Sequence, residues 1–154
     1  NDDAHRELQR QIQKKEAKRY YIALLDGNVK EDNGVINQPV GRSRTDRKKM
    51  AVVPDGRSAE THFKVIERFM RYTLCEFELK TGRTHQIRVH ASYMRHPVTG
   101  DPVYGGSNAF KLNGQMLHAY KLVLTHPTTK ETMTFTAPLP EYFTAVLDIL
   151  RKKS

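Results

Sequence analysis

The pattern of apolar and polar residues along this chain predicts mostly β-strands. Between residues 72 and 80, apolar Cys75, Phe77 and Leu79 alternate with charged residues, the period-two pattern of a half-buried strand. An apolar run from Tyr20 to Leu25 predicts a buried strand that ends at a turn. Similar patterns predict further extended segments at 35–40, 61–67, 116–124 and 132–137.

Apolar residues spaced three or four apart predict three helices. The residues expected on their apolar faces are Ala4, Leu8 and Ile12 in the first, Ile87, Ala91 and Met94 in the second, and Phe143, Val146, Leu147 and Leu150 in the third. The second helix should begin near Thr84 and the third just after Pro140. Because strands predominate without regular alternation with helices, the fold class is α+β: a mainly antiparallel sheet flanked by a few helices.

Charge narrows the choice of function. The 154 residues include 26 Lys and Arg against 17 Asp and Glu, a formal net charge of +9. This excess favours a polyanionic partner, chiefly nucleic acid, although a merely basic, solvated surface is the alternative. The single cysteine, Cys75, excludes an internal disulfide and is expected to be a small core residue in a reducing, cytoplasmic setting. No apolar run reaches the length of a membrane span, so we expect no membrane contact.

Residues 42–49 form a short basic segment, with five basic side chains and one acidic one. Strand-like residues frame the segment on both sides, which predicts a hairpin or crossover arm. Such an arm suits contacts with RNA phosphates, whereas a solvated loop is the plainer interpretation. The basic residues are Arg42, Arg44, Arg47, Lys48 and Lys49.

The densest group of chemically active side chains lies where a strand pattern changes to a helix pattern, at residues 81–90. The start of a helix offers unpaired N–H groups and a partial positive charge, so Arg83, His85 and Arg88 would lie where anions are favoured. The seven histidines lack the spacing of a metal site, and the glycines form neither a dinucleotide fingerprint nor a P-loop. We therefore expect no metal and no cofactor; a small-molecule enzyme that uses the histidine-rich face would need one.

Residues 81–90, together with His96-Pro97 and the Gly-Asp-Pro-Val-Tyr-Gly run at 100–105, closely resemble the signature of RluA-type pseudouridine synthases. The segment 18–24 is similar to the family's Tyr-x-Ala strand, with Tyr21 in the motif position, and the similarity extends over essentially the whole chain. This resemblance implies a pseudouridine synthase catalytic-domain fold. It also implies an isomerase that flips a uridine out of RNA, most naturally ribosomal RNA, and converts it to the C-glycoside without cofactor or metal.

The resemblance also implies roles for individual residues. Arg88 would pair with the catalytic aspartate and hold its carboxylate ionised and oriented. Tyr21 would stack on the flipped uracil, with proton removal at C5 as a further role, whereas the residues alone would favour an ordinary sheet aromatic. Arg83 and His85 would bind RNA or fix the turn at the helix entry.

The family's nucleophilic aspartate belongs to a His-Arg-Leu-Asp-x-x-Thr-Ser-Gly-like motif upstream of the Tyr-x-Ala strand. These 154 residues do not contain that motif, and Asp26, Asp46 and Asp101 stand in other contexts. We therefore expect residues 1–154 to be the later part of a single catalytic domain, inactive in isolation. The alternative is a non-catalytic RNA-binding module on the same scaffold.

Overall fold

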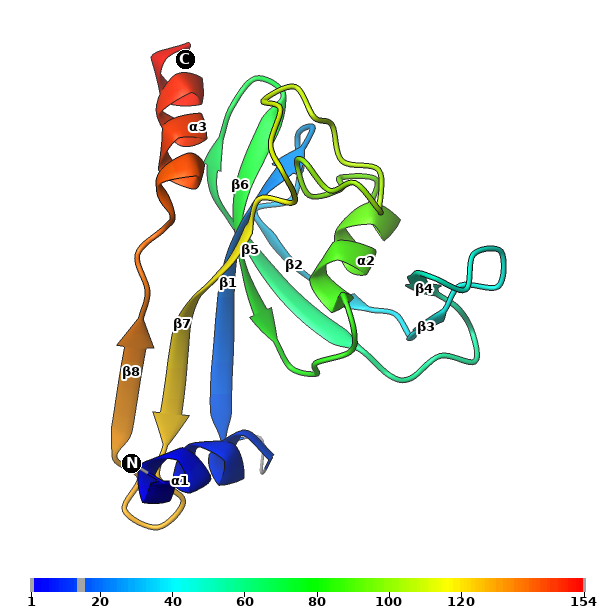
Figure 1. Cartoon of the computed structure of the whole chain (residues 1–154). Helices are drawn as coiled ribbons and strands as arrows, with labels where there is room; N and C mark the ends of the chain where they lie inside the picture. The colour runs from blue at the N-terminus through cyan, green and yellow to red at the C-terminus, as the bar shows by residue number, and fades with distance from the viewer. Residues whose placement is uncertain (1, 14–15, 154) are drawn as a thin grey trace.

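A six-stranded sheet organises the computed structural model, which describes residues 2–13 and 16–153 (Figure 1). Its strand order is β2-β5-β6-β1-β7-β8, and every neighbouring pair is antiparallel. A separate hairpin pairs β3 with β4. The strands are β1 Ala17–Asp26, β2 Asn33–Asn37, β3 Val40–Arg42, β4 Met50–Val52, β5 Glu60–Arg68, β6 Tyr72–Leu79, β7 Leu117–Thr125 and β8 Thr132–Thr136.

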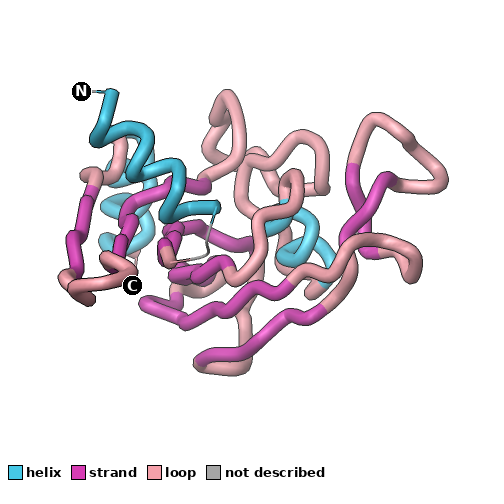
Figure 2. The backbone as a smooth tube through the Cα atoms, turned by 90° about the horizontal axis from the view of Figure 1, so that it is seen from below, coloured by secondary structure: helices cyan, strands magenta, loops and turns pink. Residues whose placement is uncertain are grey.

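The described residues form three helices: α1 Asp2–Gln13, α2 Gln86–Tyr93 and α3 Glu141–Lys152. Helix α1 crosses the end of the sheet where β1 begins, and α3 stands at the opposite end (Figures 1 and 2). The hairpin β3–β4 projects to the side of α2 away from the main sheet (Figure 1). The expected α+β class, with a mainly antiparallel sheet and a few helices, is confirmed.

Strand β1 separates two hydrophobic clusters because its alternate residues point to opposite faces of the sheet. On one face, Ala23 and Leu25 pack in the cluster that includes Ile87 and Ala91 of α2. On the other face lies a cluster that includes the predicted stripe of α3, with Ile22, Leu24, Phe143, Val146, Leu147 and Leu150. A strand buried on both faces needs a continuous apolar run, which is why the run at 20–25 stood out in the sequence.

A third cluster attaches the hairpin to α2. Val40, Ala59, Val89 and Tyr104 are all buried and pack together, with Met50 and Val52 against them. The basic segment 42–49 comprises Arg42, the last residue of β3, and the loop of this hairpin, so it extends from a base that is anchored on α2. The predicted hairpin arm is therefore confirmed.

Two of the differences between predicted and observed boundaries have a clear physical cause. The extended segment expected at 35–40 divides into β2 and β3, because Pro39 has no N–H to continue a ladder and the Gln38 N–H donates to Ala59 instead. Helix α2 begins at Gln86 rather than near Thr84, because His85 adopts a left-handed φ of 55° at the N-cap. The side chains of Leu8 and Ile12 lie outside the described residues, and Ala4 is exposed.

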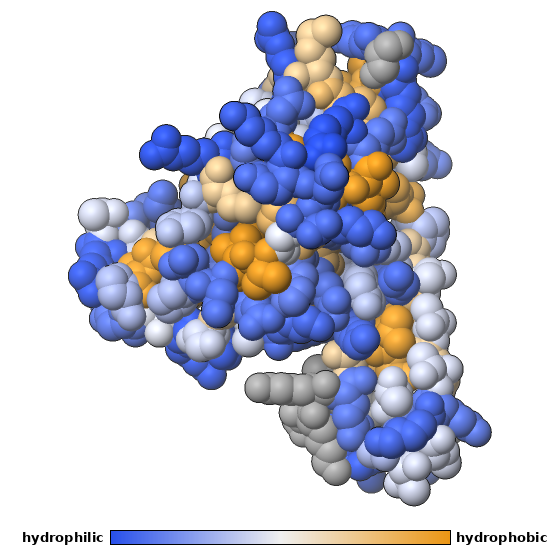
Figure 3. Space-filling view, turned by 180° about the vertical axis from the view of Figure 1, so that it is seen from behind, coloured by the Kyte–Doolittle hydropathy of each residue, from blue (hydrophilic) through white to orange (hydrophobic). Residues whose placement is uncertain are grey.

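The surface seen from behind is mostly hydrophilic, and its apolar patches are small and separate (Figure 3). None of the helices among the described residues has the length and apolar character to cross a membrane.

Candidate active site

The turn between β6 and α2 is fixed by the side chain of Gln86. Its Oε1 accepts hydrogen bonds from the Thr81 hydroxyl at 2.8 Å and from the Arg83 N–H at 2.9 Å. Its Nε2 donates to the carbonyl of Glu60 and to the Thr61 hydroxyl on β5. A buried amide that uses both ends in this way ties the turn to the sheet, so the start of α2 has a defined position.

The same network continues to His90, which is fully buried. His90 Nε2 lies 2.9 Å from the Gln38 carbonyl, which can only accept, so this nitrogen carries the proton. Nδ1 then accepts from the Thr61 hydroxyl at 2.8 Å. Burial lowers the pKa of His90, in spite of its bond to Gln38, so the ring is held neutral as a structural link between α2, β5 and the segment after β2.

Arg88 lies in the first turn of α2 and is buried with Asp101 of the following loop. Its Nε and Nη2 donate to the two carboxylate oxygens of Asp101 at 2.9 and 3.0 Å. The Asp101 carboxylate raises the pKa of Arg88, and the guanidinium Cζ also lies 5.0 Å from the ring centre of Tyr104. The position and direction of the guanidinium are therefore fixed by this chain itself.

Asp101 is held in turn by its own loop. Its Oδ1 accepts the backbone N–H groups of Val103 and Tyr104, at 3.0 and 3.2 Å. Burial alone would raise the pKa of Asp101, but these bonds and the Arg88 guanidinium hold it below its usual value. Asp101 is thus an ionised, saturated carboxylate whose role is to position Arg88.

Tyr104 connects the helix entry to the basic hairpin. Its hydroxyl accepts the Met50 N–H at 3.1 Å and lies 2.8 Å from His85 Nδ1. Partial burial and the nearby Arg88 charge lower the pKa of His85, which favours a neutral ring that accepts the tyrosine proton. Because Met50 begins β4, the Tyr104 hydroxyl links the far end of the basic arm to His85, the residue that precedes α2.

Tyr21 lies in the middle of the sheet on the face that α2 covers. It is half-buried and packs against the cluster that contains Ile87, beside the helix that carries Arg88. Arg83, in the turn before α2, donates from Nε to the Ser58 carbonyl at 2.7 Å. The residues predicted from the 81–90 motif therefore gather at the start of α2, and Tyr21 lies on β1 against the cluster that contains Ile87 of the same helix.

The basic arm keeps most of its charges in solvent. Arg42 donates to the Arg47 carbonyl at 3.3 Å, and the exposed Arg44 pairs with the exposed Asp55 at 2.9 Å. Within the described part of the chain, no acidic side chain pairs with the remaining basic residues of the arm, Arg47, Lys48 and Lys49. The arm therefore presents net positive charge.

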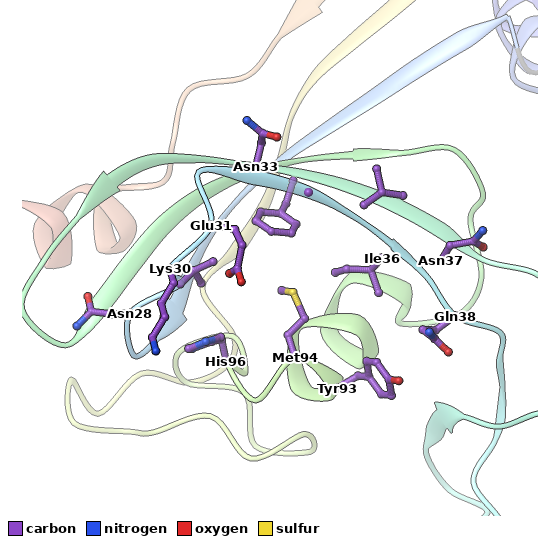
Figure 4. Close-up of a pocket in the computed structure, with 14 residues that line it drawn as sticks. Asn28, Lys30, Glu31, Asn33, Ile36, Asn37, Gln38, Tyr93, Met94 and His96 are labelled. Carbon is purple, nitrogen blue, oxygen red and sulfur yellow. The ribbon is translucent and has the colours of Figure 1, made fainter.

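Other features of the molecule do not add to this site. Burial raises the pKa of Cys75 to about 12, which leaves it an inert core thiol as predicted. No group of three potential metal ligands occurs among residues 2–13 and 16–153. A groove of about 550 Å³ lies between β2 and the end of α2, where Ile36 and Met94 extend into it (Figure 4). Tyr21 and Arg88 do not line that groove.

Sequence reasoning set aside or overlooked three residues of this network: Asp101, Tyr104 and Gln86. Asp101 stands outside the motif of the nucleophile, and its role in the structure is to position Arg88. Asp101 accepts the backbone N–H groups that lie two and three residues later, which is a turn pattern that a sequence can indicate. Its pairing with Arg88 is a tertiary contact, and no local pattern contains it. The expected pairing of Arg88 with an aspartate from outside this chain stays a prediction.

Comparisons with known proteins show the family to which the chain is similar. The family model of RNA pseudouridylate synthase matches residues 1–93. An uncharacterized RNA pseudouridine synthase, YlyB, of Bacillus subtilis is 47% identical over 152 residues, which are 99% of this chain and 50% of that protein. The ribosomal large subunit pseudouridine synthase D of Nitrosomonas europaea is 42% identical over 97% of this chain and 45% of its own length.

A solved structure has the same fold. Human RNA pseudouridylate synthase domain containing 1 superposes with a TM-score of 0.78 at 26% identity, over 98% of this chain and 72% of that one. The chain spans about half the length of the curated relatives it matches. The match to the family model covers more than half of the residues, and the chain belongs to the RluA-type family of RNA pseudouridine synthases.

Proposed function

We propose that the whole protein carrying this chain isomerises uridine to pseudouridine in RNA, with ribosomal RNA as its substrate. Residues 1–154 would form the later part of its single catalytic domain. Family membership supports this proposal, as do the names of relatives such as the pseudouridine synthase D of Nitrosomonas europaea. Work on ribosomal RNA would place the protein in the cytoplasm.

The observation that supports the proposal most strongly is the buried, oriented guanidinium of Arg88. Asp101 occupies its Nε and Nη2, whereas Nη1 has no acceptor among the described residues. Nη1 can therefore donate to a second carboxylate. A fixed arginine keeps a neighbouring carboxylate ionised and oriented, so Arg88 would hold the nucleophilic aspartate supplied by the rest of the protein.

Tyr21 would form the wall against which the flipped uracil stacks. Its ring is half-buried on the sheet, which keeps it in place, and the cluster beneath it includes Ile87 of the helix that carries Arg88. Stacking on an aromatic ring stabilises an unstacked base by roughly 1–3 kcal/mol, a useful offset to the cost of flipping.

RNA would be held by the arm and the helix entry. Arg42, Arg44, Arg47, Lys48 and Lys49 carry the positive charge of the hairpin, and Arg83 and His85 lie at the entry of α2. The Met50–Tyr104–His85 contacts connect the two regions. RNA bound to the arm would thus be positioned relative to Arg88.

The reaction itself gives a direct test. The N1–C1′ bond of uridine breaks, a C5–C1′ bond forms, the C5 proton leaves and N1 gains a proton. RNA labelled with tritium at C5 of uridine should therefore release tritium with the whole protein. The 154-residue chain alone should bind the same RNA weakly and release none.

The outcomes distinguish the alternatives. RNA binding by the whole protein without tritium release from ribosomal RNA would support a non-catalytic binding module instead. Clear turnover by the 154 residues alone would refute the proposal that they need an aspartate from elsewhere in the protein.

A further inference from the structure

Arg19 lies on β1 two residues before Tyr21. Because alternate residues of a strand share a face, both side chains point to the α2 side of the sheet. The register agrees, since Arg19 stands opposite Leu79 and Tyr21 opposite Phe77, and both partners belong to the cluster on that face. Arg19 is therefore a neighbour of the tyrosine proposed to receive the uracil.

The guanidinium of Arg19 rests on the turn at Gly82. A Cβ atom at Gly82 would lie 2.7 Å from Nη1 and 3.1 Å from Nη2 of Arg19, too close for a real side chain. Gly82 has no positive φ, so close approach, and not backbone conformation, is what a glycine permits here. The next residue is Arg83, so two guanidinium-bearing residues meet at one turn.

Arg19 also lacks an anion. In the described part of the chain, no carboxylate and no hydrogen-bond acceptor is paired with it, although the side chain is half-buried. Arginine residues in such positions are normally paired, because a partly desolvated charge without a partner is unfavourable. An anion that binds beside Arg19 would supply this acceptor.

A cavity of about 340 Å³ joins Arg19 to Tyr21. Leu122 and Phe135 line it next to Arg19, and Ala119 lines it opposite Tyr21, in agreement with the register of β7 and β8. Mostly apolar walls with a few polar groups are typical of a small-ligand site. A charged group at one side of the cavity, here the Arg19 guanidinium, fixes the orientation of the ligand. A nucleotide has this combination of a flat base and an anionic group.

We propose that Arg19 binds a backbone phosphate next to the target uridine, while the base lies in the cavity over Tyr21. This inference rests on the proposed function and adds to it a phosphate-binding residue outside the 81–90 motif. Gly82 is part of the site, because only a residue without a side chain leaves room for the guanidinium. Arg83 lies beside it and adds positive charge.

The salt dependence of RNA affinity tests the proposal, because each phosphate neutralised on a single strand contributes roughly 0.7 to the slope of log K against log salt. In the whole protein, Arg19→Met should weaken RNA binding about tenfold and lower the slope by roughly 0.7. Arg19→Lys should retain the slope. Lys18→Met is the matched control: Lys18 is adjacent but exposed on the other face of β1, and its slope should equal that of the wild type.

Gly82→Ala provides a second test that keeps every charge. The three atoms nearest to the new methyl group all belong to the flexible end of Arg19, so the variant should fold normally while displacing the guanidinium. It should weaken RNA binding in the wild-type background and have no further effect in the Arg19→Met background. Additive effects of the two substitutions would overturn the proposed contact.

The remaining outcomes separate this inference from the proposed function. An unchanged salt slope in Arg19→Met, with normal tritium release, would overturn the phosphate contact and leave the isomerase intact. Loss of thermal stability in Arg19→Met without a change in slope would show that a carboxylate of the protein itself occupies Arg19. A wild-type protein that binds no RNA would overturn both proposals.

Discussion

Arg88 and Asp101 form a two-point ion pair between α2 and the loop that follows it, with N–O distances of 2.9 and 3.0 Å. Both residues are buried, and Asp101 is only 1% exposed. A buried pair of this kind gives little net stability over an apolar pair, but it fixes direction. Its role here is to hold the Arg88 guanidinium in one orientation on α2, with Nη1 available.

Substitution of Asp101 by Asn should therefore cost more than any surface substitution. The amide keeps the size of the side chain and an oxygen for the Val103 and Tyr104 N–H groups, but it leaves the Arg88 charge buried without a counter-ion. Loss of one partner of a buried pair costs about 3–5 kcal/mol, which urea unfolding would measure. Asp55→Asn is the control, because the Arg44–Asp55 pair is exposed and its loss should not be measurable. Equal unfolding curves for the two variants would contradict this role of Asp101.

The neutral His90 predicts a loss of stability in mild acid. In the unfolded chain a histidine takes up a proton near pH 6.5, whereas burial lowers the pKa of His90 in the folded state. Between these two pKa values the unfolded state binds more protons, so stability should fall as the pH falls below about 6.5. His90→Gln should flatten this dependence between pH 7 and 5 in thermal unfolding. His5→Gln, at an exposed position of α1, should retain it; an unaltered pH dependence in His90→Gln would show that His90 is not its source.

Much of the fold could be predicted from the sequence because the relevant signals are local. The alternation from Cys75 to Leu79 marks β6, and the spacing of Phe143, Val146, Leu147 and Leu150 marks the buried face of α3. The hairpin of the basic arm followed from two apolar segments around a charged one. In each case the period of side-chain burial is itself the signal.

The interactions within the site were less accessible to prediction, because they join segments distant in sequence. Asp101 meets Arg88 across a loop, and Arg19 on β1 meets Gly82 in the turn that follows the neighbouring strand β6. Gly82 looked like an ordinary turn residue, although its φ is not positive and its lack of a side chain serves Arg19. Composition and spacing identify such residues as candidates, but only their arrangement in space pairs them.

The basic arm should contribute to RNA affinity without contributing to stability. Arg47 and Lys48 are exposed, so replacing both with Gln should leave thermal unfolding unchanged. If each contacts one phosphate, the slope of log K against log salt should decrease by roughly 0.7–0.9 per residue. Lys152 and Lys153, exposed at the end of α3, are the matched controls, and their replacement by Gln should leave the slope unaltered. A decrease of equal size in both double variants would mean that overall charge, and not the arm, sets RNA affinity.

Arg88 itself should separate chemistry from RNA binding. Arg88→Lys in the whole protein keeps a positive charge but loses the planar guanidinium. Only a guanidinium can donate to Asp101 at two points and still have Nη1 available for a second carboxylate. Because Arg88 is buried, it should make little contact with the RNA backbone. We therefore expect tritium release to fall by at least a hundredfold, as for other lost transition-state contacts, while the Kd for RNA changes little. Single-turnover rates at saturating RNA, with Kd measured separately, would check this. A variant that turns over at nearly the wild-type rate, or one whose loss lies entirely in RNA affinity, would show that Arg88 does not orient the nucleophile.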